Sequence, residues 1–371
     1  MIPYGEIECV SPLSFAIVYL LSTPEIAVVG AGLIGRSHIS VLQALDTAAM
    51  CAIVDPTEDA RLLALECAVP WYQSLSALFA AQQPAGVVIA TPNHLHVEQA
   101  IFCISQGVPV LLEKPVAATV EEGEKLLVEV ERMGVPVLVG HHRAHSPVMQ
   151  KAIEVMNSGR LGRPVSVMGS ALFYKPDDYF AAAPWRTQNG GGPILINLIH
   201  EIHNLRMLLG EIIGVQAFAS NAVRRYEVED TVAINFRFAT GALGTFLLSD
   251  TAASARSWEQ TAKENLSYTH YKDEDCYVVA GTRGSLSVPT MRLKYYTADE
   301  NRSWWKPFEE ETLTMQQSDP LVGQMLHFVD IIDRRLNPLV SVADGLANLR
   351  VVDAITRAVD SGVTIELPFN L

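Results

Sequence analysis

Cysteine is scarce in this sequence: the chain of 371 residues holds only five, and they are widely spaced. No two of them form a Cys-x-x-Cys pair and their number is odd, so neither a zinc ribbon nor a disulfide framework is supported. We therefore expect reduced, mostly buried thiols in a cytoplasmic protein. The five are Cys9, Cys51, Cys67, Cys103 and Cys276.

Basic residues are also few. Lys and Arg number 27 against 41 Asp and Glu, which gives a formal net charge of −14. Such a field repels a polyanion, so a nucleic-acid partner is not expected. With 49% hydrophobic and 18% charged residues the composition is that of a globular protein, which excludes intrinsic disorder. At about 100–200 residues per domain, the length favours two domains.

The N-terminal segment lacks the features of a targeting signal. Its apolar run at residues 13–21 is too short to span a bilayer. No Lys or Arg precedes Arg36, although a signal peptide needs a basic segment before its apolar one. We interpret residues 1–22 as a non-targeting extension, or as an overlong start-site assignment. Neither export nor a membrane partner is expected.

From residue 23 to about 145, short apolar strands alternate with helical stretches. Strands that are apolar throughout and alternate with helices indicate a parallel sheet covered on both faces. We therefore expect an α/β domain over residues 23–145. The strands are expected at 26–29, 50–54, 86–90, 108–112 and 135–139, with helices at 33–45, 57–67, 94–105 and 119–133.

After about residue 145 the pattern changes to strands that are joined by short glycine-containing turns. This pattern indicates a mostly antiparallel sheet and an α+β second domain over residues 146–371. A sheet with helices on one side leaves its other face to be covered, so we expect a homodimer or homotetramer. The strands are expected at 166–173, 215–220, 232–238, 243–248, 277–280, 285–288 and 292–296, and later helices at about 320–336 and 344–361.

A glycine motif, Gly30-Ala-Gly-Leu-Ile-Gly35, stands between an expected strand and an expected helix. In dinucleotide-binding (Rossmann) folds these glycines permit a tight turn, close approach of a pyrophosphate, and packing of the helix on the strand. Asp55 ends the next strand, twenty residues beyond Gly35, where a carboxylate can accept hydrogen bonds from ribose hydroxyls. We predict NAD, with NADP disfavoured because its 2′-phosphate meets that carboxylate; Arg61 is the one nearby cation that could offset this. The predicted cofactor contacts here are Gly30, Gly32, Leu33, Ile34, Gly35 and Asp55.

Three further segments support a resemblance to a known family. Ala90-Thr-Pro-Asn-His-Leu-His96 follows one strand, Glu113-Lys-Pro115 ends the next, and Gly190-Gly-Gly192 precedes His200. With these motifs, residues 24–371 resemble the glucose–fructose oxidoreductase/inositol dehydrogenase (Gfo/Idh/MocA) family. The resemblance implies an N-terminal Rossmann domain, a C-terminal α+β domain with a large open-faced sheet, and hydride transfer.

The resemblance also implies roles for the loop after the third strand and for Glu113-Lys114-Pro115. The loop is expected to run beneath the cofactor, and Lys114 to reach both the nicotinamide ribose and the substrate. Desolvation readily lowers the pKa of such a lysine, so that it can relay a proton. The alternative for Lys114 is a surface salt bridge to Glu113 or another neighbour. The implied cofactor contacts are Thr91, Pro92, Asn93, His96, Glu113 and Lys114.

The second catalytic segment departs from the family's pattern, in which an aspartate precedes the histidine by four residues. Here His200 stands at the histidine position and Ile196 at the aspartate position. Asn197, on nearly the same helix face as His200, is predicted to orient the substrate. Because an amide cannot act as a base, proton transfer is assigned to His200 with Lys114. The alternative for His200 is a hydrogen-bonded core histidine.

Other polar residues are candidate substrate contacts, and no metal is expected. Lys175 and Arg186 are predicted to line the cleft, although Arg186 alternatively ties down the glycine turn. His203 belongs either to packing or to a polar network. The polar segment 251–275 is expected to cover the active site, to reach a neighbouring subunit, or to be a solvated loop. The spacing of His200 and His203 does not fit a zinc-binding His-Glu-x-x-His motif.

Together these features predict an NAD-dependent dehydrogenase that acts on a carbinol carbon of a sugar, cyclitol or related polyol. His200 removes the hydroxyl proton, and Lys114 polarises the oxygen. One alternative is a redox-neutral lyase or glycosidase that retains NAD and oxidises its sugar only transiently. Another is a non-enzymatic, dinucleotide-responsive regulator, against which the presence of both Lys114 and His200 argues.

Overall fold

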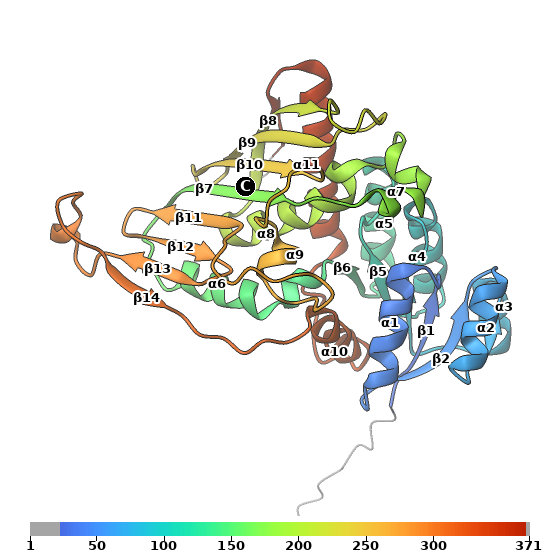
Figure 1. Ribbon diagram of the computed structural model, residues 1–371. Coiled ribbons are helices and arrows are strands. Elements are labelled where there is room, and N and C mark those ends of the chain that lie inside the picture. The colour runs from blue at the N-terminus through green and yellow to red at the C-terminus, as the bar shows by residue number, and fades with distance from the viewer. Residues whose placement is uncertain (1–22, 369–371) are drawn as a thin grey trace, which may run out of the picture.

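Two β-sheets, each with its own hydrophobic core, organise residues 23–368, which are the residues described by the computed structural model (Figure 1). The predicted extension at residues 1–22 lies outside the described residues. Within the described part of the chain, no helix is long and apolar enough to cross a membrane.

The first sheet is parallel, with six strands in the order β3-β2-β1-β4-β5-β6. This is the order of a doubly wound dinucleotide-binding domain and confirms the predicted Rossmann fold. Thr57, Ser74 and Thr119 cap α2, α3 and α5 by accepting a hydrogen bond from a backbone amide three residues on. The elements are β1 Glu25–Val29, α1 Leu33–Ala44, β2 Ala49–Val54, α2 Glu58–Glu66, β3 Trp71–Tyr72, α3 Leu75–Ala81, β4 Gly86–Ile89, α4 His96–Ser105, β5 Val110–Glu113, α5 Val120–Met133 and β6 Val137–Gly140.

The second sheet has nine strands in the order β14-β13-β12-β11-β7-β10-β9-β8-β15. It is antiparallel except for the β7–β10 pair, which confirms the predicted mostly antiparallel sheet. Helices α6, α8 and α11 pack on one face. The elements are α6 Pro147–Asn157, β7 Pro164–Leu172, α7 Asp177–Ala181, α8 Ile199–Leu209, β8 Ile212–Ser220, β9 Thr231–Phe238, β10 Leu243–Ser249, α9 Trp258–Thr261, β11 Tyr277–Gly281, β12 Gly284–Val288, β13 Arg292–Tyr295, β14 Glu309–Thr312, α10 Pro320–Ile332, α11 Val342–Ser361 and β15 Ile365–Glu366.

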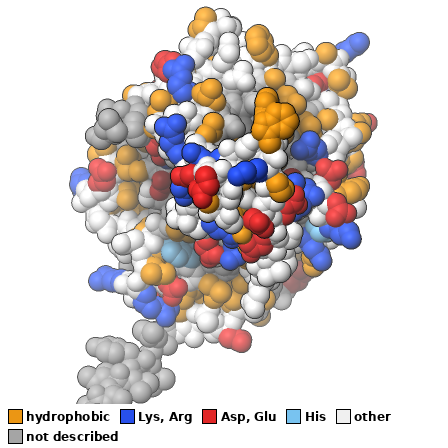
Figure 2. Space-filling model, turned by 90° about the vertical axis from the view of Figure 1, so that its left-hand side faces the viewer, with side chains coloured by type: hydrophobic (Ala, Val, Ile, Leu, Met, Phe, Trp, Pro, Cys, Tyr) orange, Lys and Arg blue, Asp and Glu red, His pale blue; other side chains and the backbone are white. Residues whose placement is uncertain are grey.

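The opposite face of the second sheet carries exposed apolar side chains. Buried and exposed residues alternate along β9 and β10, as expected for strands with one covered face. The exposed large hydrophobic side chains on these and neighbouring strands are Val165, Met168, Phe218, Leu243 and Leu247. On the side of the molecule shown in Figure 2, by contrast, Lys and Arg side chains are interspersed with Asp and Glu side chains.

Helices α10 and α11 join the two halves of the molecule. Met325 and Phe328 of α10 are buried in the core of the first sheet. In Figure 1, α10 lies beside α1 of that domain. A Cβ atom on Gly86 of β4 would lie 2.5 Å from Ile332 Cδ1, so the glycine permits this close packing. Helix α11 then contributes Leu349 to the first core and Ile355 to the second. The domain boundary at residue 145 stays a prediction.

Candidate cofactor and substrate site

The glycine loop after β1 is shaped by three different requirements. Gly30 has a φ of +91°, and a Cβ atom there would lie 2.6 Å from the Ala90 carbonyl oxygen. A Cβ on Gly35 would lie 1.9 Å from the Gly30 carbonyl oxygen, so only glycine lets α1 approach the loop. A Cβ on Gly32 would meet nothing within 4 Å. The surface above Gly32 is therefore open, as a pyrophosphate group requires.

The first turn of α1 offers its backbone amides to this open surface. The first hydrogen bond of the helix runs from Arg36 N to Gly32 O at 2.9 Å, so the preceding amides have no partner within the helix. Leu33 is 81% exposed and Ile34 is half-buried at this turn. A helix N-terminus with such amides binds anionic groups, so the loop fits a dinucleotide.

Asp55 lies beside the glycine loop and is held by three hydrogen bonds. Its Oδ2 accepts from Ala31 N at 2.9 Å, and its Oδ1 accepts from the amide and the hydroxyl of Thr57 at 2.9 and 2.6 Å. Burial by itself raises the pKa of Asp55, but these hydrogen bonds outweigh it and lower the pKa. Arg61 instead binds Glu58, with Nη2 and Oε1 2.5 Å apart.

The loop after β4 is tied to the loop after β5 by His96. The buried His96 ring places Nδ1 2.8 Å from the Pro115 carbonyl oxygen and Nε2 2.8 Å from the Thr91 carbonyl oxygen. Burial lowers the pKa of His96, although both carbonyls oppose this. Both ring nitrogens are thus occupied by backbone groups, and the predicted cofactor loop at Thr91, Pro92 and Asn93 is held in place by this residue.

Glu113, the last residue of β5, forms a buried pair that sequence reasoning missed. Its Oε1 lies 2.8 Å from His38 Nε2 of α1, and both side chains are almost fully buried. Burial by itself raises the pKa of Glu113, but the hydrogen bond and charge of His38 outweigh this and lower it. Glu113 therefore joins α1 to the end of β5, and the only advance sign of the pair was a histidine on an apolar helix.

Lys114, which follows β5 of the first sheet, contacts the segment that leads into the helix of His200. Lys114 Nζ donates to the Ile196 carbonyl oxygen at 3.3 Å, in a π-helical segment, Ile194–Leu198, that leads directly into α8. His200 is buried at the start of α8. Burial, followed by the positive charge of Lys114, lowers the pKa of His200 well below its usual value. Burial likewise lowers the pKa of Lys114, against the opposing charge of Glu113.

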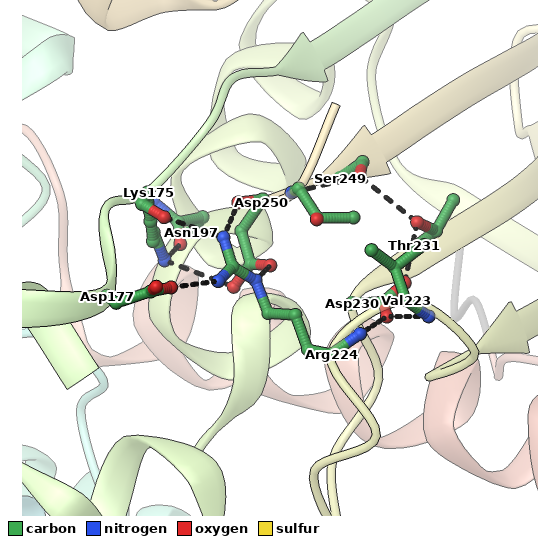
Figure 3. Close-up of polar contacts among 10 residues, drawn as sticks. Lys175, Asp177, Asn197, Val223, Arg224, Asp230, Thr231, Ser249 and Asp250 are labelled. Atoms are coloured by element: carbon green, nitrogen blue, oxygen red, sulfur yellow. Dashed lines mark hydrogen bonds and ion pairs between the residues drawn. The ribbon is translucent and has the colours of Figure 1, made fainter. Parts of the chain in front are cut away.

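Asn197 and Lys175 also meet, whereas Arg186 and His203 are engaged elsewhere. Lys175 Nζ donates to Asn197 Oδ1 at 2.6 Å (Figure 3). Arg186 donates to the Tyr179 carbonyl oxygen at 2.5 Å, and its guanidinium carbon lies 3.8 Å from the centre of the Tyr179 ring. These side-chain contacts join Arg186 to Tyr179 of α7, so its predicted roles in lining the cleft and in tying down the glycine turn both stay predictions.

His203 belongs to a cluster of imidazole rings behind the site. Its ring stacks on that of His141 with centroids 4.5 Å apart, and Asn348 Nδ2 lies 3.0 Å from His203 Nδ1. The ring of His142 lies 5.1 Å from that of His200. Among the described residues, no three His, Cys, Asp or Glu side chains are arranged to hold a metal ion.

A buried ionic cluster around Arg143 is the largest feature that sequence reasoning missed. Arg143 binds Glu201 on α8 at 2.5 Å and Glu259 on α9 at 2.8 Å. Tyr277 donates its hydroxyl to Glu201 as well. Because α9 lies within the polar segment 251–275, this segment folds against the site of its own chain. Its composition was the only sign in the sequence.

Comparisons with known proteins identify the family and relatives of this chain. The family model described as "Oxidoreductase family, NAD-binding Rossmann fold" matches residues 25–141, and the "GFO/IDH/MocA C-terminal domain" model matches residues 149–287. The chain is 30% identical to the 1,5-anhydro-D-fructose reductase of Ensifer adhaerens over 77% of this chain and 80% of that protein. It is 24% identical to the scyllo-inositol 2-dehydrogenase (NAD(+)) of Bacillus subtilis over 92% of this chain and 95% of that protein. The crystal structure of the WlbA dehydrogenase from Bordetella pertussis with NADH and UDP-GlcNAcA superposes with a TM-score of 0.74, at 24% identity, over 94% of this chain and all of that one.

Proposed function

The chain belongs to the Gfo/Idh/MocA oxidoreductase family, and from this premise we propose that it is an NAD-dependent dehydrogenase of sugars, cyclitols or related polyols. The main support is the contact between Lys114 Nζ and the Ile196 carbonyl oxygen, which joins the end of β5 to the helix that bears His200. The glycine loop leaves β1 at the same edge of the parallel sheet. The relatives' names refer to 1,5-anhydro-D-fructose and scyllo-inositol, which are polyhydroxylated rings.

In the proposed reaction, the protein's own groups handle the hydroxyl proton. Nicotinamide, when bound, supplies the carbon that exchanges a hydride with the carbinol carbon. Burial lowers the pKa of His200, so its imidazole is neutral and has a nitrogen lone pair for the hydroxyl proton, although the same shift makes it a weaker base. Lys114 donates a hydrogen bond to the same oxygen. Asn197 orients the substrate, since an amide carries no ionisable proton.

The proposed cofactor is NAD and not NADP. Asp55 is ionised beside the glycine loop, because its hydrogen bonds lower its pKa. Ribose hydroxyls can donate to a carboxylate, whereas a 2′-phosphate is repelled by it. Arg61 is already bound by Glu58, and Arg36, whose charge also lowers the pKa of Asp55, donates its Nε to the Ala31 carbonyl oxygen. The residues proposed to hold NAD are those of the glycine loop, Asp55, and the loop after β4.

We also propose a homo-oligomer in the cytoplasm. The exposed apolar side chains on one face of the second sheet, among them Phe218 and Leu247, suit burial against a second copy. The cysteines described by the structure, Cys51, Cys67, Cys103 and Cys276, are free thiols, as in proteins of reducing compartments.

The experiment that tests the proposed function is a substrate panel. Purified protein is incubated with NAD⁺ and individual aldoses, aldonates, uronates, cyclitols and alditols, and NADH formation is followed by absorbance. Mass spectrometry of the freshly purified protein determines whether it retains a dinucleotide. We expect net NADH formation with at least one polyol. A tightly retained dinucleotide without net turnover contradicts the dehydrogenase proposal and favours the redox-neutral alternative.

A further inference from the structure

Lys175 and Asn197 form a pair of hydrogen-bond donors close to His200. Lys175 follows β7, and Asn197 lies in the π-helical segment three residues before His200 (Figure 3). Because an ammonium can only donate, the 2.6 Å contact between them fixes the Asn197 amide oxygen toward Lys175. The amide NH₂ group is thereby left as a further donor. Two N–H groups of Lys175 remain for other acceptors.

The carboxylate nearest to Lys175 is already bound by another cation. Asp250 Oδ2 lies 3.9 Å from Lys175 Nζ, which is beyond hydrogen-bond distance. Arg224 Nε, however, donates to Asp250 Oδ1 at 3.0 Å, and both side chains are almost fully buried. Arg224 also donates to the backbone carbonyl oxygens of Lys175 and Asp250 at 2.7 and 2.6 Å (Figure 3). Asp250 and Arg224 therefore neutralise each other.

Of the other carboxylates near these lysines, Glu229 accepts from Ile194 N at 2.8 Å, and burial raises its pKa against the opposing charge of Lys175. Glu259 binds Arg143, and Glu113 binds His38. Lys114 Nζ, like Lys175 Nζ, donates to a neutral oxygen, the Ile196 carbonyl. Two ammonium groups are thus hydrogen-bonded to neutral oxygens of adjacent residues, and neither is hydrogen-bonded to a carboxylate.

We propose that the substrate is an acidic sugar, meaning an aldonate, uronate or aldarate, whose carboxylate binds Lys175 and Asn197 while its carbinol group meets Lys114 and His200. This inference rests on the proposed function. A carboxylate only accepts hydrogen bonds, so it matches a site that only donates, whereas a neutral hydroxyl brings a proton of its own. The carboxylate is unchanged in the reaction. The carbinol C–H hydride passes to NAD⁺, the O–H proton passes to His200, and the C–O bond becomes a carbonyl.

The charge of Lys175 makes this recognition dependent on pH. Burial lowers the pKa of Lys175 to about 8, while the charges of Asp250 and Glu259 oppose the shift and those of Arg186 and Arg224 add to it. A bound carboxylate stabilises the ammonium form, so binding is strongest below pH 8 and weakens as the lysine loses its proton above it. Arginine in place of Lys175 keeps its charge over this range.

The test compares acidic and neutral sugars of the same configuration. The pairs are D-galacturonate with D-galactose, D-glucuronate with D-glucose, and L-tartrate with L-threitol. Isothermal titration calorimetry on the NADH-saturated enzyme measures binding and decides this inference, whereas turnover with NAD⁺ decides the proposed function. The variants are Lys175→Met, Lys175→Arg and Asn197→Asp. Lys151→Met is the matched control, because Lys151 is paired with Glu154 on the outside of α6.

We expect at least one acid to bind about 10–100-fold more tightly than its neutral partner, the range for hydrogen bonds to charged groups. Lys175→Met removes this preference and Lys175→Arg retains most of it. Asn197→Asp places a competing carboxylate beside Lys175 and also abolishes the preference, so the inference is testable even if Lys175→Met does not fold. Equal binding within every pair overturns the inference, as does an unchanged preference in both Lys175→Met and Asn197→Asp. If the enzyme oxidises neutral sugars and binds the acidic and neutral member of each pair equally, the inference is wrong and the proposed function still stands.

Discussion

Replacing Gly32 by alanine is expected to weaken NAD binding without changing the stability of the fold. Gly32 has a φ of −71° and a ψ of −166°, which alanine adopts without strain, and a Cβ atom there meets nothing within 4 Å. Alanine is a poorer N-cap than glycine, at a cost of about 0.5–1 kcal/mol, but it lowers the entropy of the unfolded chain by about 0.4–1 kcal/mol. The two terms nearly cancel. We therefore expect the free energy of unfolding without cofactor to change by less than about 1 kcal/mol.

Binding of NAD responds differently to the same methyl group. The open surface above Gly32 is where a pyrophosphate approaches the backbone, and a methyl group there keeps it from the first-turn amides of α1. Loss of one hydrogen bond to a charged group costs about 1.5–3 kcal/mol, so affinity falls by about 10–150-fold. At a concentration of 100 times its wild-type Kd, NAD stabilises the wild type by about 2.7 kcal/mol. The variant then gains only about 0.3–1.3 kcal/mol.

The assay is unfolding with and without NAD, by heat or denaturant, with Gly35→Ala as the contrasting variant. A Cβ on Gly35 lies 1.9 Å from the Gly30 carbonyl oxygen, so this substitution is expected to destabilise the protein even without cofactor. If NAD stabilises Gly32→Ala as much as it stabilises the wild type, the cofactor does not bind on this loop. A large loss of stability without NAD refutes the claim that the space above Gly32 is unused by the fold.

Further predictions concern catalysis, cofactor choice, the buried ionic cluster and assembly. Lys114→Ala and His200→Ala each lower turnover by about 10²–10⁴-fold with little change in NAD affinity, measured by steady-state kinetics and calorimetry. Asp55→Ala weakens NAD relative to NADP in the same calorimetric assay. Arg143→Met leaves the buried Glu201 without its cation and destabilises the protein by about 3–5 kcal/mol in denaturant unfolding. Leu247→Glu, on the exposed face of the second sheet, lowers the oligomeric mass in light scattering without unfolding the chain.

Each of these predictions has a result that contradicts it. Near-normal turnover in His200→Ala shows that His200 is not the base. If the wild type binds NADP as tightly as NAD, Asp55 does not select the cofactor. Unchanged stability of Arg143→Met indicates that Glu201 is protonated and needs no cation; burial does raise the pKa of Glu201. A wild type that is monomeric at micromolar concentration removes the argument from the exposed sheet face.

The fold follows from the sequence wherever apolar periodicity is strong. The strands of the first sheet are continuous buried runs, and β9 and β10 alternate, so both sheets and their classes were predictable. Elements that carry no apolar pattern were missed. The fully exposed β14, with the sequence Glu-Glu-Glu-Thr, is held by backbone pairing with β13 and by ion pairs of Glu310 with Lys294 and of Glu311 with Arg160. Strands β3 and β15 have two residues each. Their existence depends on a neighbouring strand and not on their own residues.

For the candidate site, too, local sequence patterns were predictable and long-range contacts were not. Residues inside short motifs, such as Gly32, Lys114 and His200, could be named as candidates because neighbouring residues in the sequence remain neighbours in the structure. Pairs that join distant segments were missed: His38 and Glu113 are 75 positions apart, and Arg143 and Glu259 are 116 apart. Sequence patterns indicate that a charge is present but not which opposite charge it meets. That choice is made by tertiary packing.

The net charge of −14 therefore says little about the charge of the cleft. Exposed carboxylates are screened over a Debye length of about 8 Å at physiological ionic strength, whereas groups buried near the substrate act at short range and in a lower dielectric. Of the carboxylates whose charges act on Lys175, Asp250 and Glu259 are each bound by an arginine, and Glu229 accepts from the Ile194 amide. The ammonium groups of Lys114 and Lys175, by contrast, are hydrogen-bonded only to neutral oxygens. The proposed binding of an acidic sugar therefore rests on these two ammonium groups and not on the net charge of the protein.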